Sequence, residues 1–301
     1  MTPVLDALLA ALQRRHGPAL RAVLYYGSCL RGGDPAAGIV DFHVLVTTPH
    51  AAGQGWVASF FNDLLPPNVF YLETPATVET GRVGRIWRAK YAMFRERAFL
   101  RGVAGRWLLP YLWGRFAQPY RLVWCADSAL EENLARAVAR GRRHFLATVT
   151  ATLDGEYTVP EIWRHGIGLS YRTELRTEPV ERIASLIAAG AAEFRSITAG
   201  ILPDLPGCTA LAGDRYRIAP GRWRRRRATA LWALRIVSGK LLSVARLFKT
   251  LFTFDGAVDY AVWKIERHTG RPLEISDAAR RRPWLGGWVV LWRLYRSGRI
   301  R

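Results

Sequence analysis

The amino-acid sequence predicts an α/β fold, followed by a mainly helical region and a basic, amphipathic tail. Three observations favour this prediction: short apolar strands with Gly- and Pro-containing turns near the start, helical spacing of apolar residues from position 127, and positive charge gathered at the end. At 301 residues, half of them hydrophobic, the chain is long enough for two packed domains. We expect domains over 1–126 and 127–205, with a linker and tail over 206–301.

The first region alternates the patterns of strands and helices. An amphipathic helix is expected over 1–18, and this segment lacks the apolar core and cleavage site of a signal peptide. A second helix is expected over 56–65, where Pro66-Pro67 ends it. Strands rich in Val, Ile and aromatic residues are expected over 21–28, 38–46, 68–73 and 84–96. This order indicates an α/β or α+β unit over about 1–100.

From Asp127 the pattern becomes helical. An Asp-Ser start, acids in the first turn and apolar residues at helical spacing predict a long helix over 127–153. Further helices are expected over 158–171 and 179–202. The Pro-, Gly- and Asp-rich stretch 203–222 is predicted to be a loop.

The three cysteines, Cys29, Cys125 and Cys208, are far apart and have no metal-type spacing. They indicate reduced thiols, which suits the cytosol, and neither a disulfide framework nor a zinc site is expected.

The net charge of +20 is concentrated at the C-terminus, where residues 221–301 hold 19 Lys and Arg against 5 Asp and Glu. A basic, apolar tail implies an anionic partner, either nucleic acid or a membrane surface. Nucleic acid is disfavoured because the tail is too apolar for an exposed phosphate-binding arm.

The segment 228–254 is apolar, but four cations interrupt it, so we expect peripheral attachment rather than a transmembrane helix. On a helical projection, one polar arc contains Arg235, Ser238, Ser243, Arg246, Lys249 and Thr250. The apolar residues outside it are Trp232, Leu241, Leu242, Val244, Leu251 and Phe252. This pattern predicts an interfacial membrane helix, with a helix buried against a partner as the alternative.

A Gly-Ser turn, Gly27-Ser28, follows the first strand, and Asp41 interrupts the apolar second strand. Glycine lets the backbone approach a phosphate, and the serine hydroxyl can donate to its oxygens. Asp41 could hold Mg²⁺ against the same phosphates. By strand alternation, Asp41 and His43 would share the site while Phe42 packs on the other face.

This stretch resembles the signature of the polymerase-β-like nucleotidyltransferase superfamily, although His43 stands where a second acid is usual. Further blocks resemble, in the same order, the mitochondrial phosphatidate cytidylyltransferases of the translocator-maintenance type. The blocks are "YYGSCLR", "IVDFHVLV", "NVFYLE", "RIWRAKYAMFR", "YLWGRFAQPYRLV" and "IGLSYRTELR". The resemblance covers roughly residues 23–180, and that family also lacks the second strand acid. Cys29, Ala92 and Glu174 depart from its pattern of Gly, Gly and Asp.

The resemblance implies transfer of a cytidylyl group from CTP to phosphatidate in bacterial phospholipid synthesis, with Mg²⁺ as cofactor. Asp41 would hold the metal, Gly27 and Ser28 the outgoing phosphates, and Glu174 would be a second catalytic or metal-binding carboxylate. Three cations would neutralise the nucleotide or the lipid phosphate: Lys90, Arg115 and Arg176. The expected location is peripheral, on the cytoplasmic face of the inner membrane. An anionic membrane surface is then the macromolecular partner, no nucleic acid is expected, and a homo-oligomer is compatible with the sequence.

Two other functions remain open from the residues. One is a nucleotidyltransferase with another acceptor, such as RNA, a metabolite or a protein. The other is a non-catalytic membrane-associated protein of the same fold. In the second case Asp41 would be a structural strand acid, and Glu174 would form a salt bridge at a helix end.

Overall fold

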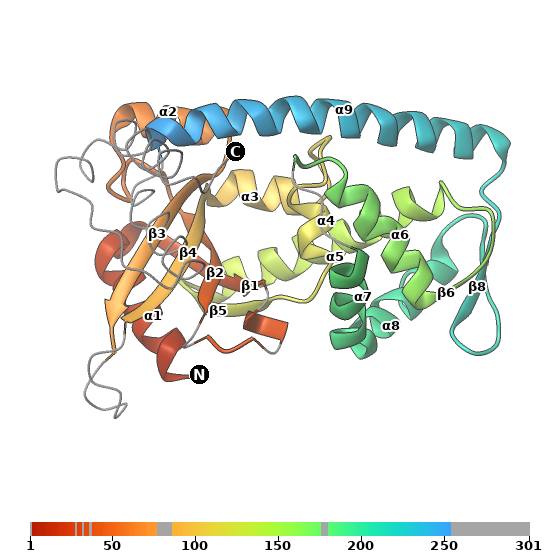
Figure 1. Cartoon of the computed structure of the whole chain (residues 1–301), viewed down its shortest axis with the longest axis horizontal. Helices are drawn as coiled ribbons and strands as arrows, with labels where there is room; N and C mark the ends of the chain where they lie inside the picture. The colour runs from red at the N-terminus through yellow and green to blue at the C-terminus, as the bar shows by residue number, and fades with distance from the viewer. Residues whose placement is uncertain are drawn as a thin grey trace, which may run out of the picture. The chain divides into compact units, whose positions relative to one another are not determined.

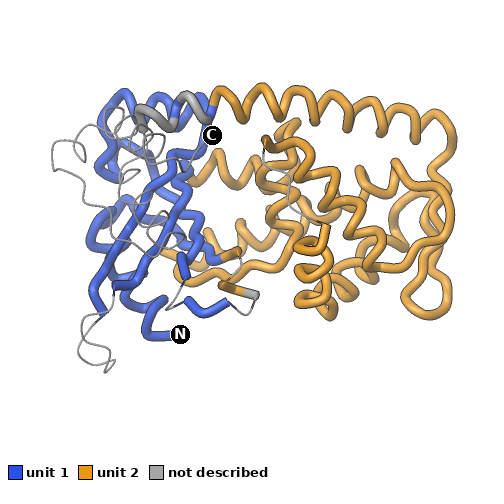
Figure 2. Tube along the Cα trace, viewed as in Figure 1, with its two compact units in different colours: residues 1–25, 33–95, 246–301 blue, residues 26–32, 96–245 orange. Residues whose placement is uncertain are grey.

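The computed structural model describes residues 2–27, 29–31, 33–35, 38–76, 86–175 and 180–253, which form a mixed α/β structure (Figure 1). The chain divides into two compact units (Figure 2). Unit 1 contains residues 1–25, 33–95 and 246–301, and unit 2 contains residues 26–32 and 96–245. The units divide at other positions than the expected domains, whose boundaries therefore stay a prediction.

The elements of unit 1 confirm the expected alternation of helices and strands. They are α1 (Pro3–His16), a 3-10 turn (Gly17–Ala19), β1 (Leu20–Tyr26), β2 (Ile39–Val46), α2 (Trp56–Leu64), β3 (Asn68–Pro75) and β4 (Ile86–Arg95). The last residue of β1 is assigned to unit 2. Helix α1 begins at a proline, whose fixed φ and missing N–H suit the first helical turn, and it ends at Gly17 with a positive φ.

The strands of unit 1 form a mixed sheet in the order β3-β4-β2-β1. Strand β2 runs parallel to β4, and β3 runs antiparallel to β4. Because β2 is buried along most of its length, its sequence is a nearly continuous apolar run. The register places Asp41 of β2 beside Lys90 of β4, and Lys90 beside Tyr71 of β3.

Unit 2 is mainly helical, and the helices expected over 127–153, 158–171 and 179–202 are confirmed. Its helices are α3 (Glu96–Val103), α4 (Trp113–Phe116), α5 (Ser128–Thr150), α6 (Val159–Tyr171), α7 (Val180–Ala189), α8 (Ala191–Ala199) and most of α9 (Arg222–Thr253). Its strands are β5 (Arg121–Cys125), β6 (Gly155–Thr158), β7 (Cys208–Ala210) and β8 (Arg215–Ile218), and 3-10 turns span Cys29–Arg31 and Leu202–Asp204.

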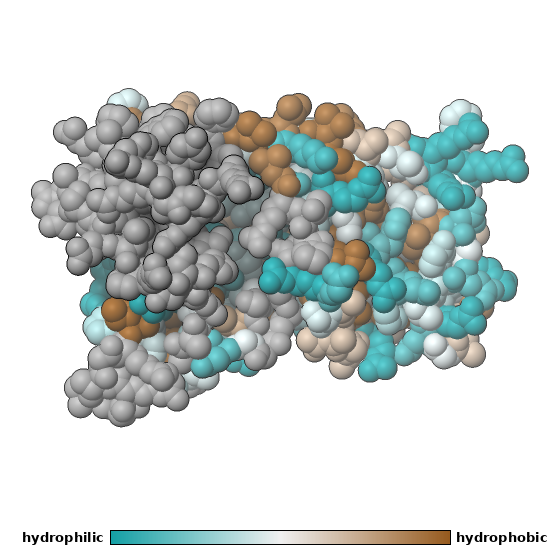
Figure 3. All heavy atoms as spheres, viewed as in Figure 1, coloured by the Kyte–Doolittle hydropathy of each residue, from teal (hydrophilic) through white to brown (hydrophobic). Residues whose placement is uncertain are grey.

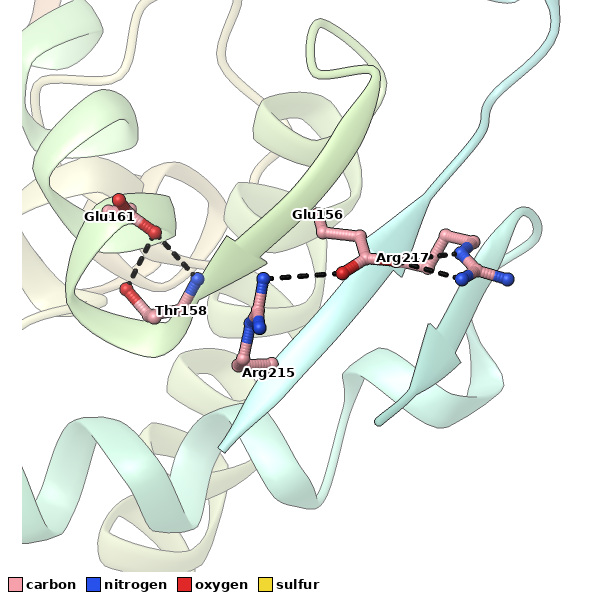
Figure 4. Close-up of polar contacts among 5 residues, drawn as sticks. All are labelled: Glu156, Thr158, Glu161, Arg215 and Arg217. Atoms are coloured by element: carbon pink, nitrogen blue, oxygen red, sulfur yellow. Dashed lines mark hydrogen bonds and ion pairs between the residues drawn. The ribbon is translucent and has the colours of Figure 1, made fainter. Parts of the chain in front are cut away.

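Local capping and aromatic packing explain the long helices of unit 2. The Asp127 side chain accepts a hydrogen bond from the Leu130 N–H at 2.7 Å and caps α5. At the start of α6, the Glu161 carboxylate accepts from the N–H and the hydroxyl of Thr158 (Figure 4). The core contains a row of buried rings in which Trp163 stacks on Phe145 and contacts Phe194.

The prediction of a loop over 203–222 is wrong in part, because β7 and β8 lie there and pair with β6 in a three-stranded antiparallel sheet. The strands are three or four residues long, too short for a clear alternating pattern. Tyr216 and Ile218 are buried, and Arg215 and Arg217 pair across the sheet with Glu156 (Figure 4). Gly213 and Asp214, both with positive φ, make the turn.

A glycine in α5 sets how closely α3 approaches, which gives a stability prediction. A Cβ at Gly141 would lie 2.0 Å from the backbone carbonyl oxygen of Val103. Gly141→Ala should therefore destabilise the protein by about 1–3 kcal/mol, although alanine is usually the better helix former. Gly168 of α6 is the matched control, since a Cβ there meets nothing within 4 Å. Gly168→Ala should be neutral or stabilising by up to about 1 kcal/mol, and urea unfolding of both variants measures the contrast.

Candidate functional site

The turn after β1 requires glycine, as the sequence predicts. Gly27 has a φ of 94°, a conformation that residues with a Cβ rarely adopt. It leads from the last residue of β1 toward a 3-10 turn at Cys29–Arg31. Ser28 lies outside the described residues, so its role stays a prediction.

In unit 1, Asp41 and Ile39 are half-buried, whereas the other residues of β2 are buried. Phe42 is fully buried and packs edge to face on Tyr25, with ring centroids 5.9 Å apart, which confirms its packing role. His43 is also fully buried and stacks on Phe94 at 5.6 Å. The expectation that His43 shares an accessible site with Asp41 is wrong, because the ring lies in the core.

A row of polar side chains crosses three strands of unit 1 at Asp41. Asp41, Lys90 and Tyr71 are register partners on β2, β4 and β3, and partners on paired strands project from the same face of a sheet. Two residues further along β3, Glu73 accepts hydrogen bonds from Tyr71 at 2.8 Å and from Arg88 at 3.0 Å. Burial and the Glu73 carboxylate raise the pKa of Tyr71, which therefore stays a neutral donor.

Sequence reasoning identified Asp41 and Lys90 but missed Tyr71, Glu73 and Arg88. The sequence did contain a signal for them, because residues two apart in a strand lie on the same face. Tyr71 and Glu73 therefore share one face of β3, and Arg88 and Lys90 share one face of β4. Only the register between the strands brings the two pairs together.

The row fits a divalent ion only in part. Mg²⁺ usually keeps several waters and is held by one or two carboxylates together with the substrate's phosphates. Asp41 can supply one such carboxylate. Within the described ranges, no three His, Cys, Asp or Glu side chains gather into a closed metal site. The residues therefore suit an ion whose coordination the substrate completes.

In unit 2, Arg115 and Glu174 form an ion pair, with Nη2 of Arg115 at 2.9 Å from Oε1 of Glu174. The guanidinium also lies over the rings of Tyr26 and Tyr111, at 5.6 and 5.1 Å from their centroids. Burial opposes the charge on Arg115, but Glu174 and the surrounding tyrosines raise its pKa well above the ordinary value, so it stays charged. Arg176, the other predicted cation here, lies outside the described residues.

This ion pair brings together three sequence blocks that are far apart in the chain. Tyr26 directly precedes the Gly27 turn, Gly114-Arg115 lies in α4, and Ser170 and Glu174 lie in and just after α6. Gly114 allows the approach, since a Cβ there would lie 2.5 Å from the Ser170 hydroxyl oxygen. In unit 2, Arg115 therefore contacts both Tyr26, the residue before Gly27, and Glu174.

The long helix α9 turns the buried side chains of its polar arc, Arg235 and Lys249, toward the protein and leaves apolar residues such as Leu241 and Val244 exposed. Arg235 is buried, donates from Nε to the Leu108 carbonyl at 3.0 Å, and lies over the rings of Trp113 and Trp232. Trp232, expected on the membrane face, is buried and donates to the Thr148 carbonyl. The expectation of an exposed Trp232 is therefore wrong, whereas membrane attachment of the helix stays a prediction. The side chains of Thr250, Leu251 and Phe252 lie outside the described part.

In unit 1, the last turns of α9 supply hydrogen-bond donors to the loop between α2 and β3. Arg246 donates to the Pro66 carbonyl at 3.0 Å, and Lys249 donates to the carbonyls of Leu65 and Pro67 at 2.6 and 2.5 Å. Burial, reinforced by the charge of Arg246, lowers the pKa of Lys249 to about 7.

The shifted pKa of Lys249 makes stability depend on pH. Between about pH 7 and 10.5 the folded lysine loses its proton while the unfolded lysine keeps it, so the unfolded state binds more protons and stability rises with pH. We expect the wild-type protein to gain about 1–3 kcal/mol relative to Lys249→Met between pH 6.5 and 9.5. Urea unfolding of both proteins at the two pH values measures this gain, and a constant difference would contradict it.

By length and composition, Arg222–Arg246 is the one described helix that could cross a membrane, with Val180–Ala189 and Ala191–Asp204 as a further candidate if that bent pair acts as one span. Packed helices of soluble proteins meet the same criteria. The buried, hydrogen-bonded face of α9 favours a helix that packs on unit 2.

Comparison with protein-family models finds no match, and comparison with curated proteins finds none either. Among solved structures, the chain is similar to a nucleotidyltransferase-like protein from Exiguobacterium sibiricum, with 11% sequence identity and a TM-score of 0.28. The alignment covers 98% of this chain and 91% of that chain. At this TM-score the similarity does not establish a shared fold.

Proposed function

We propose that this protein is a nucleotidyltransferase that transfers the cytidylyl group of CTP to phosphatidate. The observation that carries the proposal is the strand, turn and strand of β1, Gly27 and β2, with Asp41 beside Lys90 in register. A positive-φ glycine suits close approach to a phosphate, and a carboxylate next to a cation suits a metal-bridged anion. The choice of CTP and phosphatidate rests on the resemblance of the sequence blocks.

In the proposed reaction, an oxygen of the phosphatidate phosphate attacks the α-phosphorus of CTP. The bond from that phosphorus to the oxygen of the β-phosphate breaks, and pyrophosphate leaves. The attacking phosphate is already anionic, so the reaction needs no strong general base. A bound Mg²⁺ would neutralise charge on the phosphates.

Each residue has a defined part in this proposal. Asp41 holds the metal ion, and Lys90 beside it neutralises a phosphate. Gly27 and Ser28 bind the departing β- and γ-phosphates, and Arg176 is a further cation for CTP or the lipid. We assign Glu174 to orienting Arg115 rather than to the ion, because its Oε1 accepts the Arg115 hydrogen bond.

Because phosphatidate resides in a bilayer, we place the protein on the cytoplasmic face of the inner membrane, bound peripherally. The acceptor is then met at an anionic surface and not in solution. Nucleic acid has no role in this proposal.

The test is a transfer assay with CTP labelled at the α-phosphate, Mg²⁺ and vesicles containing phosphatidate. Label should enter the lipid phase as CDP-diacylglycerol, and pyrophosphate should be released in equal amount. Vesicles with diacylglycerol instead of phosphatidate are the control, because that lipid lacks the attacking phosphate. Transfer to RNA, a metabolite or protein instead would favour a different acceptor, and no transfer from any nucleotide would favour a non-catalytic protein.

A further inference from the structure

The outward face of α9 is an apolar stripe. Leu234, Val237, Leu241 and Val244 follow one another at spacings of three, four and three, and Trp223 lies three turns before Leu234. These five side chains are between 41% and 84% exposed. Figure 3 shows hydrophobic residues gathered at the middle of the upper edge of the view, where α9 runs, and hydrophilic residues toward the right end of that edge. Water-exposed apolar stripes of this length are unusual on a monomer and indicate a docking surface.

The opposite face of α9 prevents the helix from turning this stripe inward. Trp232 and Arg235 are fixed in unit 2 by hydrogen bonds to the carbonyls of Thr148 and Leu108. Gly239 packs so closely that a Cβ there would lie 2.5 Å from the Thr173 carbonyl oxygen. Rotation about the helix axis would break these hydrogen bonds and would place a residue with a Cβ at the close contact with Thr173, so the stripe stays exposed.

The charge on α9 indicates what kind of surface binds to the stripe. The sequence of α9 contains no Asp or Glu, and its first turns contain Arg222 and the run 224–227. Two of these arginines are used within unit 2, since Arg224 donates to the Pro206 carbonyl and Arg225 pairs with Asp154. Arg226 and Arg227 lie in the same turns. An apolar stripe with a cationic end complements an anionic lipid surface, where aliphatic side chains enter the interface and cations meet headgroups.

We propose that the stripe defined by Trp223, Leu234, Val237, Leu241 and Val244 is a docking surface for an anionic lipid bilayer, with α9 lying along the membrane. The stripe extends for about 30 Å along the helix axis, at 1.5 Å per residue. This proposal adds a membrane-binding surface to the proposed function, and it rests on that function for the identity of the lipid substrate, phosphatidate. Binding is measured without CTP, so this proposal and the transferase proposal can fail separately.

The test is co-sedimentation of the full-length protein with vesicles of phosphatidylglycerol and phosphatidylcholine, or of phosphatidylcholine alone. Leu234→Gln/Leu241→Gln should lower binding to the anionic vesicles by roughly tenfold or more at both low and high salt. Arg226→Gln/Arg227→Gln should lower it at low salt only, because salt screens exposed charge. Val180→Gln is the matched control, since Val180 is equally exposed in unit 2 but lies on α7.

Unchanged vesicle binding by Leu234→Gln/Leu241→Gln would overturn the proposal. So would a lipid-free wild-type dimer that this variant converts to a monomer, because the stripe would then bind a second copy of the chain. If the double variant unfolds, as judged by circular dichroism, Val237→Cys with an environment-sensitive fluorophore replaces it. A blue shift on adding anionic vesicles supports the proposal, and an unshifted spectrum contradicts it.

Discussion

Replacing Asp41 with asparagine should lower the rate of cytidylyl transfer by about a hundredfold or more while leaving the protein folded. Asparagine is nearly isosteric, so β2 should keep its register with β4. The variant loses the negative charge beside Lys90, and with it the proposed ligand for an ion that would offset charge on the transferring phosphate. Initial rates at saturating Mg²⁺ and CTP measure the loss, and thermal unfolding checks the fold.

Asp63→Asn is the control for Asp41→Asn. Asp63 is also a carboxylate of unit 1, but it forms an exposed ion pair with Arg95 at 2.6 Å. Its removal should cost little stability and leave the transfer rate near that of the wild type. If Asp41→Asn retained near-normal turnover, Asp41 would be a structural strand acid and the proposed metal role would be wrong.

The second large effect is expected at the ion pair of unit 2. Arg115→Met should lower kcat/KM by roughly ten- to a hundredfold, mainly through KM for CTP, because the proposed charged hydrogen-bond donor to phosphate is lost. Glu174→Gln should cost less, since Arg115 stays in place with a weaker acceptor. The double variant should be no worse than Arg115→Met alone, because Glu174 acts through Arg115.

The outcome of this cycle separates two roles for Glu174. If Glu174 also binds the metal, its effect should multiply with that of Arg115→Met and raise the Mg²⁺ concentration needed for half-maximal rate. If it orients Arg115, the half-saturating Mg²⁺ concentration should not change. A loss of thermal stability alone, with normal kcat/KM in both single variants, would make the pair purely structural.

Much of the secondary structure could be predicted from the sequence, because strong local signals specify it. A nearly continuous apolar run gave β2, a stretch rich in aromatic and apolar residues gave β4, and a cap followed by helical spacing gave α5. Strands β7 and β8 were missed because strands this short carry almost no periodic signal. In addition, the arginines of β8 pair with Glu156 of β6, which lies about 60 residues earlier in the chain. The division into compact units could not be predicted either, because unit 1 contains residues 246–301, which follow unit 2 in the sequence.

Individual residues of the candidate site could be predicted from the sequence, but the contacts between them could not. Glycine at Gly27 and an acid at Asp41 have local signatures, whereas the link of Arg115 to Glu174 spans 59 residues. The expectation of an exposed Trp232 on α9 was wrong for a physical reason. Helical periodicity distinguishes a polar face from an apolar face but not the inside from the outside, and Arg235 and Lys249 satisfy main-chain carbonyls inside the protein.

The hydrogen bonds from the end of α9 to the loop after α2 constrain the order in which the nascent chain can fold. Arg246 and Lys249 follow their acceptors at Leu65, Pro66 and Pro67 by 180 to 184 residues. At a ribosomal rate of 5–20 residues per second, the donors emerge roughly ten to forty seconds later. We expect the loop to remain solvated during that interval, so that these hydrogen bonds form late in the folding of unit 1.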